Sequence, residues 1–152
     1  MWRKLAQETR CLVFADGFYE PKGEKGKEAS RPWHFFQFAD ERIFAFGGLW
    51  KQVIDRETGE IVAEGFVIIT TDATDEMRPI HHRHPLILRP DQWAGWLDHK
   101  TNNSKEFLDS IVSPWAGDPL SHWQVSNRPK SAQFDDKKCI EPDTDKQEDL
   151  FA

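Results

Sequence analysis

The hydrophobic residues of this chain fall into short runs that are separated by turn-forming residues. Each run spans four to six mostly apolar positions, a length typical of strands rather than helices. The runs lie at 11–15, 33–38, 43–46 and 66–71. Turn signals such as Asp16-Gly17 and the charged, glycine-containing stretch 23–28 stand between them. The pattern therefore predicts a protein built mainly from short antiparallel strands.

The order of the runs also predicts how some strands pair. The stretch 18–22 runs into the charged loop 23–28, so we expect a hairpin there. Residues 33–38 and 43–46 flank a short turn, which predicts another hairpin rich in aromatic residues. Residues 66–71 are strongly apolar and β-branched, which favours a central place in the sheet.

Residues 2–9 look like the end of a helix, and helical spacing marks two further segments in the second half of the chain. Residues 91–98 follow a proline, and residues 104–111 carry their large apolar side chains on one face. A last strand is expected at 122–126. Residues 143–152 are polar and acidic until Leu150-Phe151, and we expect them to form a disordered tail.

Composition narrows the class of protein. Of 152 residues, 38% are hydrophobic, including seven Trp and eleven Phe, as expected for one packed domain. The formal charge of −6 argues against a protein that grips any nucleic acid nonspecifically, although local basic patches are compatible with it. Cys11 and Cys139 form no disulfide framework, and no apolar stretch suits a signal peptide or membrane span. We therefore expect a cytoplasmic protein that does not enter a membrane.

Two segments carry titratable side chains on turns. In residues 10–20, an apolar run and a turn bring Glu20 next to the expected core, and in residues 78–85 two prolines bracket a histidine cluster. One acid and one imidazole on fixed loops are sufficient for proton transfer near neutral pH. From these residues alone, the favoured interpretation of Glu20 is a structural carboxylate that caps backbone amides or pairs with an arginine.

The histidine cluster also raises the alternative of a metal site. In an extended loop His82 and His84 point to one side and His81 to the other, so at most two of them face one ion. The chain has no His-Glu-x-x-His helix and no Cys-x-x-Cys pair. We therefore expect neither a metal nor another cofactor.

Residues 10–20, with the sequence RCLVFADGFYE, match nearly every position of the pattern R-C-[LI]-[VI]-x-A-x-G-[FW]-[FY]-E. Collinear matches follow at 44–50 (FAFGGLW), 66–71 (FVIITT) and 80–88 (IHHRHPLIL). In these motifs the chain resembles the SRAP family, the SOS-response-associated peptidase domain of abasic-site-processing proteins. The resemblance runs from residue 10 to about 142. It implies an α+β fold with a mostly antiparallel, partly open barrel-like sheet and short flanking helices.

The resemblance also implies roles for single residues. Glu20 corresponds to the active-site acid of the family, and His81 to the histidine that acts as general acid and base in imine formation and reversal. Arg83 matches an arginine that touches phosphate, and Thr70 a threonine that lines the pocket. His82 and His84 stand at variable positions, where we expect loop or DNA-contact residues.

The chain departs from the family at its beginning. Family members carry a cysteine directly after the initiator methionine and an N-x-R-x-E-T segment, whereas position 2 here is Trp2. In the family, as the resemblance implies, the amine of that cysteine attacks the aldehyde of an abasic site in single-stranded DNA and its thiol closes a thiazolidine. Without such a thiol we expect a labile imine at best. Cys11 matches a structural cysteine of the family, and Pro21 replaces a usual tryptophan.

Three functional interpretations remain open, so the sequence does not decide whether the chain is an enzyme. The first is an abasic-site-processing protein of the SOS response whose SRAP domain, residues 1–142, lacks its N-terminal segment and is completed by a separate fragment. The second is a catalytically degenerate module that binds single-stranded DNA and the sliding clamp. The third is the peptidase or lyase of the family label, which would need the same missing cysteine.

The C-terminal tail carries a separate signal. Residues 147–151, QEDLF, resemble the pentapeptide by which bacterial repair proteins dock into the sliding clamp. In that motif Gln147 would form hydrogen bonds, while Leu150 and Phe151 would fill an apolar pocket. The resemblance therefore implies the clamp as a partner beside single-stranded DNA with abasic sites.

Overall fold

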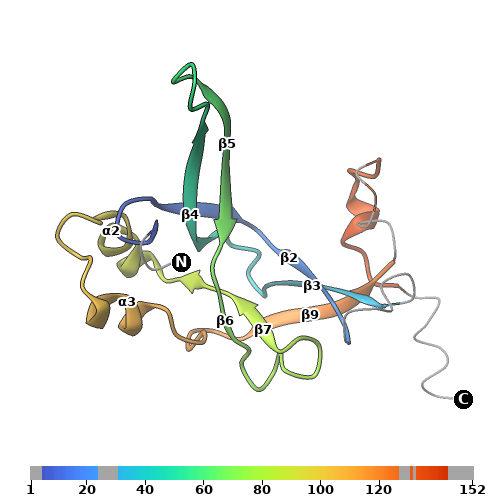
Figure 1. The fold of residues 1–152 in the computed structure, drawn as a ribbon. Coiled ribbons are helices and arrows are strands. Elements are labelled where there is room, and N and C mark those ends of the chain that lie inside the picture. The colour runs from blue at the N-terminus through green and yellow to red at the C-terminus, as the bar shows by residue number, and fades with distance from the viewer. Residues whose placement is uncertain (1–4, 24–30, 127–130, 132, 144–152) are drawn as a thin grey trace, which may run out of the picture. The chain divides into compact units, whose positions relative to one another are not determined.

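The structure is a computed structural model that describes residues 5–23, 31–126, 131 and 133–143. Every strand pair in the described part of the chain is antiparallel, and the sheets are accompanied by two short α-helices (Figure 1). The α+β, mostly antiparallel fold is therefore confirmed, and the sheets formed by the described strands are open. In chain order the elements are β1 (Arg10–Ala15), β2 (Phe18–Pro21), β3 (Trp33–Phe38), β4 (Phe44–Ile54), β5 (Ile61–Ile68), β6 (Thr70–Asp72), β7 (Arg83–Pro85), β8 (Ile87–Leu88), α2 (Pro90–Leu97), α3 (Lys105–Ile111), β9 (Leu120–Val125) and the 3-10 helix η3 (Lys137–Cys139).

The chain divides into two compact units, and each has its own sheet. Unit 1 comprises Met1–Ala15, Ile43–Thr74 and Arg83–Gly117, and unit 2 comprises Asp16–Arg42, Asp75–His82 and Asp118–Ala152. No helix in the described residues is long and apolar enough to cross a membrane.

Unit 1 holds a sheet of order β1-β4-β5, with β8 also paired to β4, and a two-stranded sheet of β6 and β7. Both helices belong to this unit and begin within one residue of the predicted segments. The carboxamide of Gln92 accepts a hydrogen bond from the Arg89 amide at 2.9 Å, and the Ser104 hydroxyl accepts one from Phe107 at 3.1 Å. The core of the unit is a cluster of buried apolar side chains from the sheet and both helices, namely Ala6, Leu49, Ile69, Leu86, Leu88, Trp96, Leu108 and Ile111.

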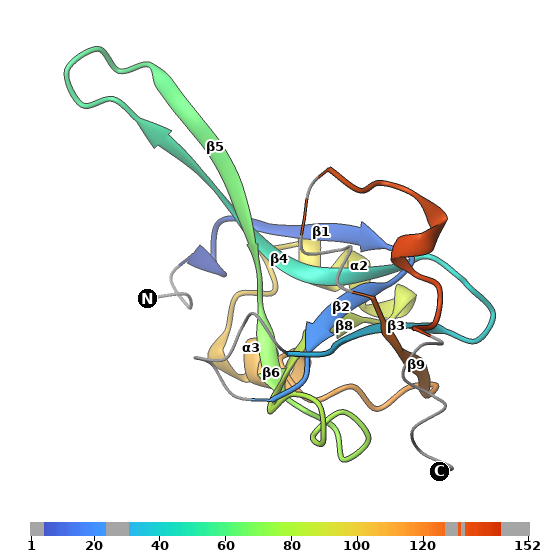
Figure 2. The same cartoon turned by 90° about the vertical axis from the view of Figure 1, so that its right-hand side faces the viewer.

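The hairpin of β4 and β5 extends away from the rest of unit 1 (Figures 1 and 2). Every residue of β5 is exposed, including Phe66 and Val67 at 60% each. β5 pairs only with β4 in the described sheet, so it is an edge strand. The expected central position of this segment is therefore wrong. Apolar, β-branched composition favours a strand but does not decide which other strands lie beside it.

Unit 2 is organised around a sheet of order β2-β3-β9. The hairpin expected from residues 18–22 is confirmed, because Phe18 pairs with Phe36 and Pro21 with Trp33. The second expected hairpin is wrong. β3 pairs with β2 and β9, whereas β4 pairs with strands of unit 1. The short link between β3 and β4 carries the chain from one unit to the other rather than folding it back on itself.

Candidate functional site

Glu20 is presented by β2, where it lies directly opposite His34 of β3. The turn before β2 needs glycine. A Cβ atom at Gly17 would lie 2.2 Å from Cζ of Phe35 and 2.8 Å from the backbone oxygen of Phe36. Absence of a side chain at Gly17 therefore lets the turn pack against β3 and fixes where β2 begins.

His81 is held by the turn that precedes it. The amides of Ile80 and His81 both donate to the carbonyl of Met77, at 2.8 and 3.0 Å, and Ile80 and Met77 are buried. The amide of Gly23, beyond the end of β2, donates to the Ile80 carbonyl at 3.2 Å. The backbone before His81 is thus a turn anchored beside β2, and the extended backbone considered for the histidine cluster is found only from Arg83 onward, in β7.

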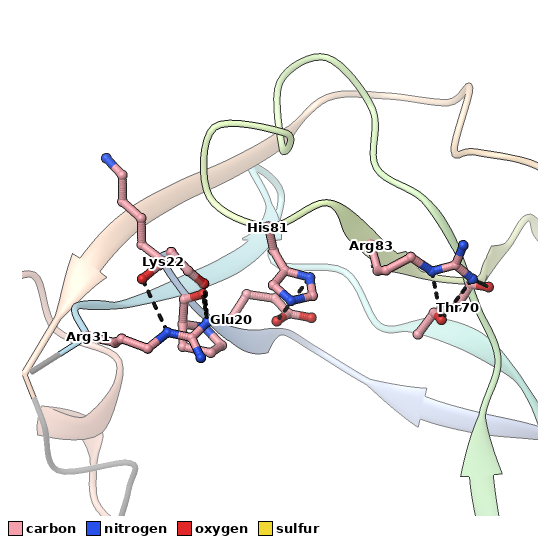
Figure 3. A network of polar contacts seen from close by, with 8 residues as sticks. Glu20, Lys22, Arg31, Thr70, His81 and Arg83 are labelled. Atoms are coloured by element: carbon pink, nitrogen blue, oxygen red, sulfur yellow. Dashed lines mark hydrogen bonds and ion pairs between the residues drawn. The ribbon is translucent and has the colours of Figure 1, made fainter. Parts of the chain in front are cut away.

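The two side chains expected to be catalytic come together in unit 2. Nδ1 of His81 lies 4.0 Å from Oε2 of Glu20, and the side chains are 21% and 19% exposed (Figure 3). Burial raises the pKa of the Glu20 carboxyl, while the charges of His81 and Arg31 act in the opposite direction. A partly dry acid next to an imidazole is able to give and take protons near neutral pH.

Arg31 is a member of this site that the sequence analysis missed. Its guanidinium is buried and donates to the carbonyl oxygens of Pro21, at 3.0 Å, Lys22 and Gly23 (Figure 3). It thereby fixes the C-terminal end of β2 and supports the ionised form of Glu20. The available signal was an arginine two residues before the aromatic strand that pairs with β2.

Three further polar side chains lie on the same face of the sheet as Glu20, because residues paired across neighbouring strands share a face. Register places His34 between Glu20 and Gln124, and His122 lies opposite Phe36. The His34 and His122 rings are 5.5 Å apart. Burial, then the nearby charges of His122 and Lys22, lowers the pKa of His34 to about 4. Burial also lowers the pKa of His122.

A second polar cluster, in unit 1, surrounds Arg83. Register places Arg83 opposite Asp72, and its Nη1 lies 2.9 Å from Oδ1 of Asp72. Nε and Nη2 donate to the hydroxyl of Thr70 at 3.2 and 3.1 Å, and Nη2 also donates to the Thr70 carbonyl (Figure 3). The structure thus joins two of the residues expected to contact DNA.

The other two histidines of the cluster differ sharply in exposure. His82 is exposed, and its ring centroid lies 4.7 Å from that of His81. His84 is 1% exposed and lies in β7, and burial lowers its pKa. The expectation that His84 is a loop or DNA-contact residue is therefore wrong. Among the described residues, no three His, Cys, Asp or Glu side chains are placed to hold a metal ion.

Neither of the two thiols has the features of an activated nucleophile in the described structure. Cys11 and Cys139 are both free. Burial raises the pKa of the Cys11 thiol, which keeps it protonated at neutral pH. The clamp-like residues Gln147, Leu150 and Phe151 lie outside the described residues.

The sequence and the structure were compared with known proteins. The family model described as SOS response associated peptidase (SRAP) matches residues 1–131. This chain belongs to that family. Abasic site processing protein YoaM of Bacillus subtilis is 33% identical over 135 residues, which cover 86% of this chain and 56% of YoaM. Abasic site processing protein YoqW of Bacillus subtilis is 31% identical over 92% of this chain and 60% of its own length.

The fold is also similar to solved structures. A crystal structure of a protein from Bacteroides thetaiotaomicron superimposes with a TM-score of 0.77 at 27% identity, over 92% of this chain and 59% of that protein. This chain therefore spans well under two thirds of the length of the SRAP relatives that it matches.

Proposed function

We propose that this protein processes abasic sites in single-stranded DNA, as part of the DNA damage response, with Glu20 and His81 as its proton-transfer pair. The observation that carries the proposal is the 4.0 Å approach of a carboxyl whose pKa is raised by burial to an imidazole on an anchored turn. Membership of a family whose relatives are named abasic site processing proteins supplies the substrate class.

The chemistry proposed for this pair is reversible imine formation. The ring-opened sugar of an abasic site is an aldehyde, and an amine adds its lone pair to the aldehyde carbon. In the resulting carbinolamine, protonated His81 gives a proton to the oxygen, which leaves as water, while Glu20 accepts a proton from nitrogen. Hydrolysis runs through the same groups in reverse. Because no electrons leave the system, the step needs no redox partner.

The stable form of the adduct requires a thiol that adds to the imine carbon. Cys11 does not fit this role, because burial keeps its thiol protonated and it sits within strand β1. We propose that a separate N-terminal fragment that begins with cysteine supplies both the amine that forms the imine and the thiol that adds to the imine carbon. Without that fragment, the product of this chain is an imine that water reverses.

We also propose contacts to DNA for Thr70, His82 and Arg83. Arg83 offers a guanidinium to a backbone phosphate, for which its planar fork is well suited. Thr70 orients that guanidinium through its hydroxyl and carbonyl oxygens. His82 is exposed and can donate to phosphate or sugar oxygens.

The test is cross-linking of the purified protein to a single-stranded oligonucleotide that carries one abasic site. Samples with and without borohydride, which reduces an imine to a stable amine, are separated on a denaturing gel. We expect a band only with borohydride. Adding an N-terminal fragment that begins with cysteine should give a second band that survives without reductant and migrates as DNA joined to that fragment.

Matched variants assign the chemistry to the proposed pair. E20Q and H81Q should each lower the initial rate of cross-linking about 100-fold or more, the usual size of a lost acid–base catalyst. E57Q and H99Q, which make the same changes outside the site, should leave the rate unchanged. Equal rates in E20Q and E57Q would refute the proposed role of Glu20. If the protein binds the DNA on a native gel but gives no cross-link with or without borohydride, the result would instead support a module that binds single-stranded DNA without covalent chemistry.

A further inference from the structure

The environment of Arg83 has a feature that phosphate binding does not explain. A guanidinium that binds DNA phosphate needs a free direction of approach and a net positive charge. Here one terminal nitrogen, Nη1, lies 2.9 Å from a carboxylate oxygen of Asp72. The side chains of Arg83 and Asp72 are 39% and 80% exposed, so solvent reaches both.

The backbone makes this ion pair a consequence of strand register. Asp72 and Arg83 are directly opposite residues of β6 and β7, while Thr70 lies opposite Pro85. Thr70 accepts from Nε and Nη2, and Asp72 accepts from Nη1. Thr70 therefore fixes the plane of the guanidinium, while Asp72 accepts from a different guanidinium nitrogen, Nη1.

A groove of about 380 Å³ in unit 1 adjoins the pair. Asp72 and Arg83 contribute charged side chains to its lining, together with Thr70 and Thr71. The rest of the lining is mainly apolar, from Leu49, Val67, Ile68, Ile69, Val112 and Pro114. A strand of nucleic acid that entered this groove would bring its phosphates into the field of both charges.

We propose that Asp72 is a positioning residue that gates Arg83. In the free protein Asp72 holds the guanidinium, and a backbone phosphate of single-stranded DNA displaces the carboxylate from Nη1 while Thr70 keeps the guanidinium in place. Because the carboxylate competes with phosphate and repels it, Asp72 lowers affinity for any single strand. This inference rests on the proposed function, since it assigns a regulator to its phosphate contact.

The test measures binding of a short fluorescein-labelled single-stranded oligonucleotide by anisotropy over a series of salt concentrations. D72N keeps the shape of the side chain and removes its charge, and we expect it to bind about fivefold more tightly. D72E restores the charge and should return affinity to the wild-type value. R83Q should bind more weakly and reduce the slope of log K against log salt by about 0.7, the value for one phosphate contact on a single strand.

The matched control is D118N. Asp118 is also exposed and lies 2.7 Å from an arginine, Arg42, so D118N changes the net charge of the protein and breaks an ion pair in the same way. It should change affinity little. The double variant D72N/R83Q should bind single-stranded DNA no more tightly than R83Q, because the Asp72 carboxylate acts through Arg83. Circular dichroism of each variant confirms that the fold is retained.

The outcomes separate this inference from the proposed function. A wild-type protein that binds and cross-links DNA, with D72N no tighter than D118N, refutes the gate alone. A gain in D72N that persists in D72N/R83Q also refutes it, because the effect would then be general charge. A wild-type protein that binds no single-stranded DNA at low salt refutes the proposed function, and the gate with it.

Discussion

Acid should destabilise this protein through His34. Burial, with the charges of His122 and Lys22, lowers the pKa of His34 from 6.5 to about 4 in the folded protein. The unfolded chain therefore binds a proton at a pH where the folded protein does not. The resulting stability is fully present above pH 6.5, and it is lost as the pH falls from 6.5 towards 4.

The size of the effect follows from the two pKa values. At pH 5 nearly every unfolded chain carries the proton and few folded molecules do. The difference in proton binding amounts to about 2 kcal/mol of unfolding free energy lost between pH 7 and pH 5. Because the His34 side chain is only partly buried, this is an upper value.

The contribution of His34 is measured by urea unfolding of the wild type and of H34Q at pH 7 and pH 5. Tryptophan fluorescence monitors the unfolding. Glutamine does not titrate, so the loss of stability between the two pH values should be up to about 2 kcal/mol smaller in H34Q. Altered packing would change stability equally at both pH values, and other titrating groups such as His84 and Glu20 remain in both proteins. An identical pH dependence in wild type and H34Q would refute the reasoning.

Four further predictions concern other parts of the chain. Since burial raises the pKa of Glu20, its contribution to stability falls as pH rises above the usual carboxyl value, so E20Q should unfold at higher urea than wild type at pH 7 but not at pH 4. Gly17→Ala should lower the unfolding free energy by about 2 kcal/mol, because its Cβ would overlap Phe35; unchanged urea denaturation would contradict this. V62K, on the exposed edge strand β5, should reduce self-association in light scattering without lowering stability. Replacing residues 150–151 with alanines should abolish capture by immobilised sliding clamp, and capture equal to wild type would remove the proposed clamp contact.

The sequence by itself predicted most elements of this protein and singled out Glu20 and His81, which the structure brings within 4.0 Å of each other. The predicted helices 91–98 and 104–111 begin within one residue of the observed ones, because helix starts depend on nearby residues such as Pro90 and the N-cap Ser104. The motif of residues 10–20 predicted the family and singled out Glu20, and that of residues 80–88 singled out His81. All of these signals are local in the chain.

Beyond the predicted hairpin of β2 and β3, tertiary structure decided which strands are neighbours. Residues 33–38 and 43–46 form strands as expected, yet they lie in different sheets, and β5 is an exposed edge despite its apolar sequence. Alternation of side chains fixes which residues share a face of one strand. It carries no information on the strand that forms the next set of hydrogen bonds, which depends on segments far away in sequence.

The surroundings of the functional residues were decided in the same way. His84 looked like a surface residue beside its exposed neighbour His82, but packing in β7 buries it. Arg31 and His34 reach the environment of Glu20 only because β3 pairs with β2, and Asp72 meets Arg83 only because β6 pairs with β7. The sequence shows which side chains can carry a charge. Their pKa values and their ion-pair partners depend on burial and distance, which are defined only in the folded chain.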